Sequence, residues 1–171
     1  MHYGRIVILV GVIGSVVGFV LKSASSLGEE ALVLLSQADP ASWPSGFSTT
    51  WTALYNDTAW AAIVFALALV GSLIVAFTPP IGRPVNRLFG LSAAVLGILM
   101  LIIGVVATLG AANDAEALQN GFAQAAAAGA IPDAYSVSIG FGWYLLILGG
   151  ALVAIGGVLS LIARPGEDAI E

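Results

Sequence analysis

The chain has 171 residues, of which 59% are hydrophobic and 9% are charged, and its formal net charge is −5. Soluble domains carry about 25% charged residues, so this composition excludes an ordinary soluble domain and indicates an integral membrane protein. The chain has no cysteine, and its one histidine is His2. Iron–sulfur clusters, cysteine zinc sites and a haem held by paired histidines within the membrane are therefore excluded, and we expect no cofactor and no metal.

Four long apolar runs are the main feature of the sequence. An α-helix rises 1.5 Å per residue, so about 20 apolar residues span a hydrocarbon core of about 30 Å. Apart from Arg5 at the edge of the first run, the runs contain no ionisable side chain. Proton relays, ion paths and voltage sensors need such groups at membrane depth, which argues against all three. The sequence predicts an all-α fold, a single membrane domain built as a four-transmembrane-helix bundle, with spans at 4–21, 59–78, 88–110 and 139–163.

The basic residues are distributed unevenly around these spans. Four arginines flank one side and a single lysine the other: Arg5, Arg83, Arg87 and Arg164 against Lys22. Positive charge near helix ends marks the cytoplasmic side, so we expect both termini to be cytoplasmic, with the inner loop 79–87 and the tail 164–171. The segments 22–58 and 111–138 are then outside, and they hold most of the acidic residues: Glu29, Glu30, Asp39, Asp57, Asp114, Glu116 and Asp133.

Glycines recur every seven residues in three of the four spans. This spacing keeps them near one face of a helix and favours left-handed crossing of neighbouring helices. Helices in lipid associate largely through close contact, which glycine permits because it has no side chain. We expect these faces to pack the bundle or to dock another protein: Gly11, Gly14 and Gly18; Gly90, Gly97 and Gly104; Gly142, Gly149 and Gly156. The second span carries alanines instead, and we expect it at the periphery of the bundle or facing lipid.

The first outer segment predicts an amphipathic helix followed by an aromatic stretch. Leu27, Ala31 and Leu35 share one helical face, and Asp39-Pro40 ends the helix. Aromatic residues then follow at intervals: Trp43, Phe47, Trp51, Tyr55 and Trp60. Such residues favour the headgroup level of a membrane, so we expect them along the outer interface, where they could also anchor a partner protein.

The second outer segment predicts another short amphipathic helix. Asn113 and Asp114 resemble the start of a helix, and Leu118 and Phe122 lie on its apolar stripe. We expect this helix to lie on the bundle or to cap it. Further along the chain, Trp143 and Tyr144 mark the return into the membrane, again at the outer interface.

Few residues suggest chemistry. Arg83 and Arg87 are four residues apart and could contact an anionic lipid headgroup, although topogenic charge also explains them. No nucleophile–base pair or pair of carboxylates is placed for catalysis, and the glycines lie inside apolar spans without a nucleotide-binding pattern. We therefore expect neither an enzyme nor a protein that binds nucleic acid.

The layout resembles the claudin-like tetraspan plan, with a longer first outer segment that contains Trp43 and Trp51 and with a short inner loop. The paired cysteines of the claudin motif are absent from this sequence. The resemblance implies a four-helix membrane protein of the kind that also accompanies bacterial membrane machines. The Ala- and Gly-rich composition is similar to that of small actinobacterial subunits of Mce-type lipid importers or of respiratory supercomplexes.

These observations together suggest a non-catalytic accessory or structural subunit of a larger bacterial inner-membrane complex, with an Mce-type lipid transporter as the first candidate. Its partners would be an integral-membrane protein complex and membrane lipids. The sequence leaves three alternatives: a stand-alone membrane protein that binds lipid or a small molecule, a claudin-like homo-oligomeric scaffold, and an accessory subunit of a respiratory complex.

Overall fold

The computed structural model describes residues 3–78 and 86–162, and it contains no strand in these two ranges. Its elements in chain order are α1 (Tyr3–Val20), a 3-10 turn η1 (Ser26–Gly28), α2 (Glu29–Ala38), α3 (Thr50–Asp57), α4 (Ala59–Phe77), α5 (Arg87–Ala127) and α6 (Phe141–Ile162). The helices α1, α4, α5 and α6 are long and apolar enough to cross a membrane. The prediction of an all-α protein with four membrane-spanning helices is therefore confirmed.

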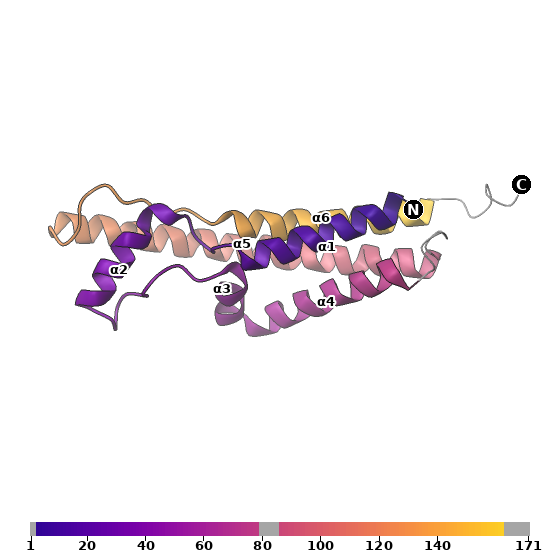
Figure 1. Ribbon diagram of the computed structural model, residues 1–171, viewed down its shortest axis with the longest axis horizontal. Coiled ribbons are helices and arrows are strands. Elements are labelled where there is room, and N and C mark those ends of the chain that lie inside the picture. The colour runs from indigo at the N-terminus through magenta and orange to yellow at the C-terminus, as the bar shows by residue number, and fades with distance from the viewer. Residues whose placement is uncertain (1–2, 79–85, 163–171) are drawn as a thin grey trace, which may run out of the picture.

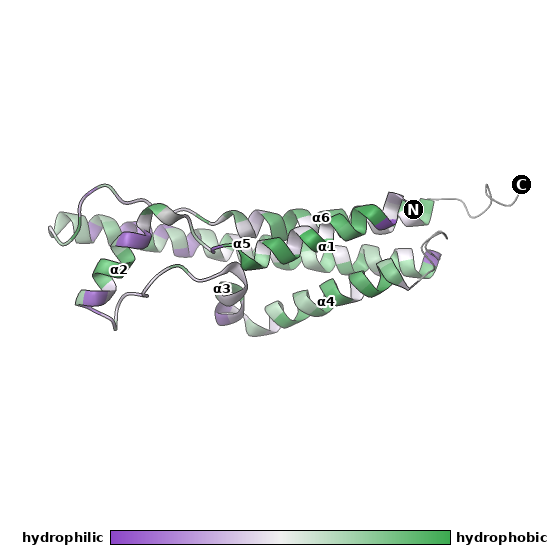
Figure 2. Ribbon diagram, in the orientation of Figure 1, coloured by the Kyte–Doolittle hydropathy of each residue, from purple (hydrophilic) through white to green (hydrophobic). Residues whose placement is uncertain are grey.

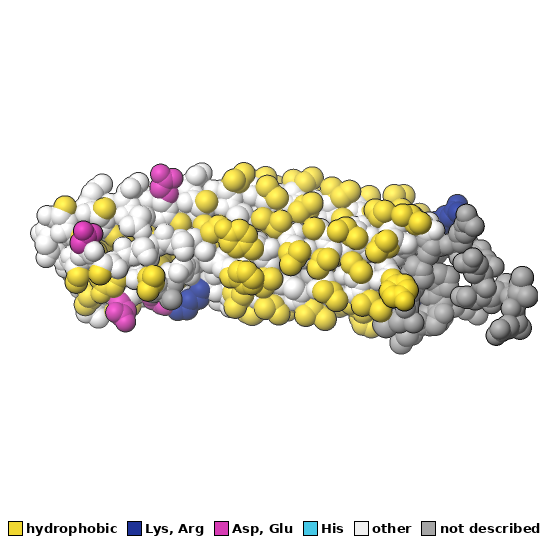
Figure 3. Space-filling model, turned by 90° about the horizontal axis from the view of Figure 1, so that it is seen from above, with side chains coloured by type: hydrophobic (Ala, Val, Ile, Leu, Met, Phe, Trp, Pro, Cys, Tyr) yellow, Lys and Arg dark blue, Asp and Glu magenta, His cyan; other side chains and the backbone are white. Residues whose placement is uncertain are grey.

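The four long helices run along the long axis of the molecule (Figure 1). The start of α1 and the end of α6 lie at one end, and α2 lies at the other end beside the far part of α5. Hydrophobic residues dominate the bundle, and hydrophilic residues gather toward the α2 end (Figure 2). The middle of the bundle in Figure 3 is a band of hydrophobic side chains in which no acidic or basic side chain is visible, and the charged side chains lie toward the two ends of the molecule. Such a band suits contact with lipid tails.

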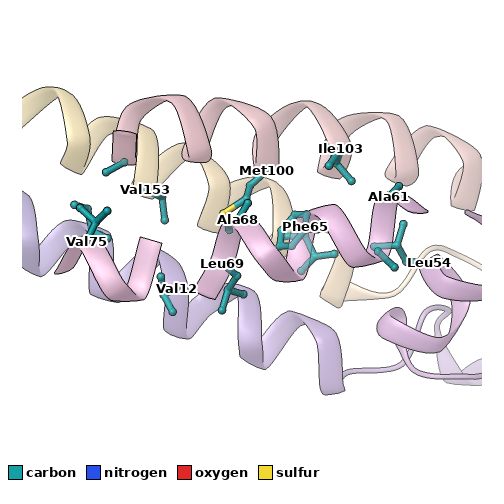
Figure 4. Packing of buried hydrophobic residues seen from close by; sticks show 14 of the residues in the cluster. Val12, Leu54, Ala61, Phe65, Ala68, Leu69, Val75, Met100, Ile103 and Val153 are labelled. Atoms are coloured by element: carbon teal, nitrogen blue, oxygen red, sulfur yellow. The ribbon is translucent and has the colours of Figure 1, made fainter. Parts of the chain in front are cut away.

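The helix α6 packs closely against both α1 and α5, whereas α4 contacts α5 and α1 less extensively. Side chains fill the α4 interface. Phe65 is fully buried, and it shares one apolar cluster with Leu69 of the same helix and with Met100 and Ile103 of α5 (Figure 4). α4 also buries small residues such as Ala62, so the alanine-rich span is part of the core as well as of the lipid-facing surface.

Hydroxyl groups buried within the spans are satisfied inside their own helices. Each donates a hydrogen bond to the carbonyl oxygen four residues earlier, which removes the cost of a bare polar group in hydrocarbon. The pairs are Ser15 with Gly11 (3.0 Å), Ser72 with Ala68 (2.8 Å), Thr108 with Gly104 (2.7 Å) and Ser160 with Gly156 (2.8 Å). These hydroxyls therefore stabilise the bundle and are not left as open binding groups.

The helix α5 differs from the prediction. The sequence predicts a span ending at residue 110 and a separate short helix after Asn113, whereas the structure has one continuous helix of 41 residues. α5 contains no proline, the next one in the chain being Pro132. The stretch after Gly110 consists largely of residues that favour helices, so nothing interrupts the hydrogen-bond ladder. Residues 111–127 extend the helix by about 25 Å at 1.5 Å per residue.

This extension supports a small lobe, formed by residues 22–49 and 111–140. Its apolar core consists of residues from α2, the end of α5 and the connection to α6: Ala31, Leu32, Leu35, Phe122 and Ile131. Isolated bridges join Lys22 to Thr49 and Ala24 to Ile139 at the base of the lobe. The lobe is thus a folded unit tied to the bundle, and α2 is packed on α5 within it.

Candidate functional site

The glycines of α1 and α6 meet pair by pair across an antiparallel contact. A Cβ atom added to Gly11 would lie 2.6 Å from the carbonyl oxygen of Gly149, and one added to Gly18 would lie 2.8 Å from that of Gly142. A Cβ added to Gly156 would lie 2.6 Å from the carbonyl oxygen of Gly4. Real Cβ atoms are not found so close to backbone atoms, so each pair requires glycine on both sides.

A second face of α6 meets α5 in the same manner. A Cβ on Gly150 would lie 2.6 Å from the amide nitrogen of Leu101, and a Cβ on Gly97 would lie 2.6 Å from the Cα atom of Ala154. Gly90 and Gly104 are less tightly enclosed, with nearest atoms at 3.2 and 3.3 Å. The heptad glycines of all three helices are therefore placed against neighbouring helices of the same chain.

Gly14 is the exception among the predicted glycines. No atom lies within 4 Å of a Cβ built on it. Its neighbours on that side of α1 are exposed: Val10 (51%), Ile13 (62%) and Val17 (43%). Gly14 therefore lies on an open face of α1, whereas Gly18 lies in the contact with α6.

The predicted aromatic residues separate into two groups. Some lie inside the protein: Phe122 is 1% exposed and stacks on Trp43 in the lobe, with ring centroids 5.9 Å apart, and Phe47 packs against the same cluster. Trp143 is 3% exposed, and its Nε1 atom donates a 2.9 Å hydrogen bond to the carbonyl oxygen of Ser23. This bond fixes the start of α6 to the segment that follows α1.

Other aromatics lie at the junction of bundle and lobe. The ring of Trp51 meets that of Phe19 edge-on, with ring centroids 5.0 Å apart, and it stacks on the ring of Tyr55, with centroids 6.2 Å apart. Trp60 and Tyr144 are 68% and 50% exposed, and both sit near the ends of spanning helices, a position that suits a membrane interface. Of the two arginines proposed to contact anionic lipid, Arg87 is the exposed first residue of α5, and Arg83 lies outside the described residues.

Two hollows adjoin each other where α3 meets α5. The polar cleft has a volume of about 320 Å³ and is lined by residues of α3, α5 and the lobe, among them Asn56, Asp57, Ala111 and Asp114. The apolar crevice has a volume of about 210 Å³ and lies between α4 and α5. Leu54, Ala61 and Ile103 from its lining lie near one another at one end of the close-up (Figure 4). Asp57 and Ala107 line both hollows, so the two hollows adjoin at these residues.

The sequence pattern does not reveal three polar residues of this structure. Asp57 and Asp114 were expected as outer charges or as helix caps, yet both line the polar cleft. Arg5 was expected at the membrane edge, yet it is 1% exposed in the first turn of α1. Charge counts along a sequence do not report burial, and only the packing of helices far apart in the chain places these side chains.

The chemistry available to the described residues is that of a binding surface. Among residues 3–78 and 86–162, no group of three histidine, cysteine or acidic side chains is placed to hold a metal ion. The cleft offers carboxylates, an amide and apolar walls.

No protein-family model matches this chain, and no curated protein or solved structure is significantly similar to it.

Proposed function

We propose that the protein is a non-catalytic accessory subunit of a larger bacterial inner-membrane complex, and that its lobe lies outside and contacts the partner. One observation carries this proposal. The lobe is held beyond the bundle by the continuous helix α5, and its segment η1–α2 exposes two leucines, Leu27 of η1 (66% exposed) and Leu34 of α2 (51% exposed).

The position of these leucines argues for a protein partner. The apolar span of α5 ends near Gly110, and Phe122, against which α2 packs, lies about 18 Å further along the helix axis. At that distance from the spans, lipid tails do not cover exposed leucines. Apolar surface that remains outside the membrane is a feature of protein–protein contact sites.

The glycine faces restrict how that partner is bound. Most of the glycines are enclosed by helices of the same chain, so they pack this bundle and leave little backbone surface for another helix. The partner contact is therefore assigned to the lobe and to the exposed face of α1 around Gly14. A lipid importer of the Mce type remains the first candidate for the complex, with both termini of this chain in the cytoplasm.

The test is gentle extraction of the tagged protein from its native membrane, followed by mass spectrometry. The proposal expects the subunits of one membrane complex in fixed stoichiometry with the tagged chain. Leu34→Glu should reduce that recovery, whereas Gln37→Glu, an exposed polar change on the same helix, should not. Recovery of the tagged chain with lipid alone, or equal recovery for both variants, would contradict the proposal.

A further inference from the structure

The polar cleft and the apolar crevice together have the form of a site for an amphiphile. The crevice is lined by Leu54, Ala61, Ile102, Ile103 and Val106, and it opens between two helices that face the membrane. The exposed ring of Trp60 at its edge places the crevice at the headgroup end of the hydrocarbon region. A hydrocarbon chain can therefore enter the crevice sideways from one leaflet.

The negative charge of the polar cleft indicates that the headgroup of the amphiphile is cationic. An oxygen of the Asp57 carboxylate would lie 3.9 Å from a Cβ atom on Gly110, so Asp57 lies against α5. Asp114 follows Gly110 by four residues, which is one helical turn, and so it lies on the same side of α5. Both carboxylates line the cleft, and the residues that line it include no lysine or arginine.

Lys22, which directly precedes the cleft-lining residue Ser23, is already engaged. Lys22 forms an ion pair with Glu29, and this is the sole salt bridge among the residues that the structure describes. Asp57 accepts a 3.1 Å hydrogen bond from the hydroxyl of Thr58 and forms no ion pair there. The cleft thus presents negative charge directly above an apolar crevice, which complements a cationic group attached to a hydrocarbon chain.

We propose that these two adjoining hollows bind a membrane lipid with an amine headgroup, its amine beside Asp57 and Asp114 and one acyl chain between α4 and α5. The site needs no partner protein, so it is independent of the accessory role. Ala107 is its midpoint, since it lines both hollows.

The experiment uses the full chain in nanodiscs that contain a trace of photoreactive lipid with a diazirine in the acyl chain. Phosphatidylethanolamine and phosphatidylglycerol are compared, because they share the phosphate and differ in the amine. Labelling of residues 99–107 is measured by mass spectrometry relative to labelling of the lipid-facing residues of α6. We expect that ratio to be higher for phosphatidylethanolamine by about threefold, the size expected of partly exposed charge pairs.

Variants separate a site from general contact with lipid. D57N together with D114N should abolish the preference for the amine lipid while leaving acyl-chain labelling of the crevice. Ala107→Phe should remove that labelling for both lipids. The control is Val105→Phe on the lipid-facing side of α5, where Val105 is 40% exposed; it should change neither the crevice labelling nor the preference for the amine lipid. Equal ratios for the two lipids in the unaltered protein would overturn the assignment of the amine. Unchanged labelling in Ala107→Phe would overturn the site, provided that the variant keeps the trypsin resistance of the unaltered protein.

Discussion

The bundle contains two kinds of helix contact. Between α1 and α6 the backbones touch, because glycine stands opposite glycine at Gly11 and Gly149 and again at Gly18 and Gly142. Between α4 and its neighbours the backbones are kept apart by side chains such as Phe65 and Leu69. The α1–α6 contact has no space for even one added methyl group. The contact of α4 can adjust, because its side chains can change rotamer. This difference explains why the apolar crevice lies beside α4 and suggests that α6 is the fixed support of the fold.

The largest effect should follow from a side chain placed in the glycine contact. In Gly149→Leu the new side chain would meet the carbonyl oxygen of Gly11, which lies 2.6 Å from the Cβ position, together with the backbone of Ser15. Because these are backbone atoms, α1 must move as a whole, and we expect loss of the folded bundle. Gly149→Ala should cost roughly 1–3 kcal/mol, the range for overpacked cores. Unfolding in mixed micelles, followed by circular dichroism, measures both, and near-unaltered stability of Gly149→Leu would contradict the account.

A smaller loss should follow from removing a side chain at the α4 contact. Phe65→Ala leaves a void at a fully buried position. We expect a cost of about 2 kcal/mol, below the range of about 3–5 kcal/mol for soluble cores, because a separated α4 would still lie in lipid. The same unfolding assay applies. If Phe65→Ala unfolded the protein more readily than Gly149→Leu, the ranking of the two contacts would be reversed.

The junction of bundle and lobe should respond more weakly. Trp143→Phe keeps an aromatic but smaller ring at this buried position and removes the Nε1 hydrogen bond to the carbonyl oxygen of Ser23. We expect a loss of about 1 kcal/mol, typical of a single buried hydrogen bond. Hydrogen exchange should rise at residues 22–25 and at the start of α6 and stay unchanged in the middle of the bundle. A uniform rise along α6 would show that the bond supports the whole helix.

The smallest effect, with the opposite sign, is expected at Gly14. A Cβ there meets no atom within 4 Å, so Gly14→Ala should be neutral or should stabilise the isolated protein by about 0.5–1 kcal/mol through helix propensity. It is the matched control for Gly149→Ala, since both replace a glycine in a spanning helix. If Gly14→Ala leaves the isolated protein stable but lowers recovery of a partner complex, the open face of α1 is part of the partner contact.

The spans could be predicted from sequence because each depends on local composition. Lipid requires long apolar helices, and the runs that contain Gly11, Gly97 and Gly149 satisfy that requirement without reference to one another. The heptad spacing also indicated helix faces, but it could not give partners. The pairing of Gly11 with Gly149 depends on the register of two helices that are far apart in the chain.

The lobe and the hollows were harder to predict. Asn113 and Asp114 resemble a helix start, and a sequence pattern cannot distinguish a cap from an uninterrupted helix when no proline or chain turn intervenes. Phe122 and Trp143 are aromatic residues of the kind that favours a membrane interface, yet both are buried by segments that are distant in the sequence. Asp57 and Asp114 line the same cleft only because the fold places the end of α3 beside α5.

The most direct test of the two kinds of contact is a pair of spin-label distance measurements, which the chain suits because it has no cysteine of its own. Labels on exposed residues would be introduced as Ile13→Cys with Leu148→Cys, across α1 and α6, and as Leu67→Cys with Ile98→Cys, across α4 and α5. The account predicts a narrow distance distribution for the first pair and a broader one for the second, which narrows when amine lipid is present. Equal widths for the two pairs would contradict the view that α6 is fixed and α4 adjustable.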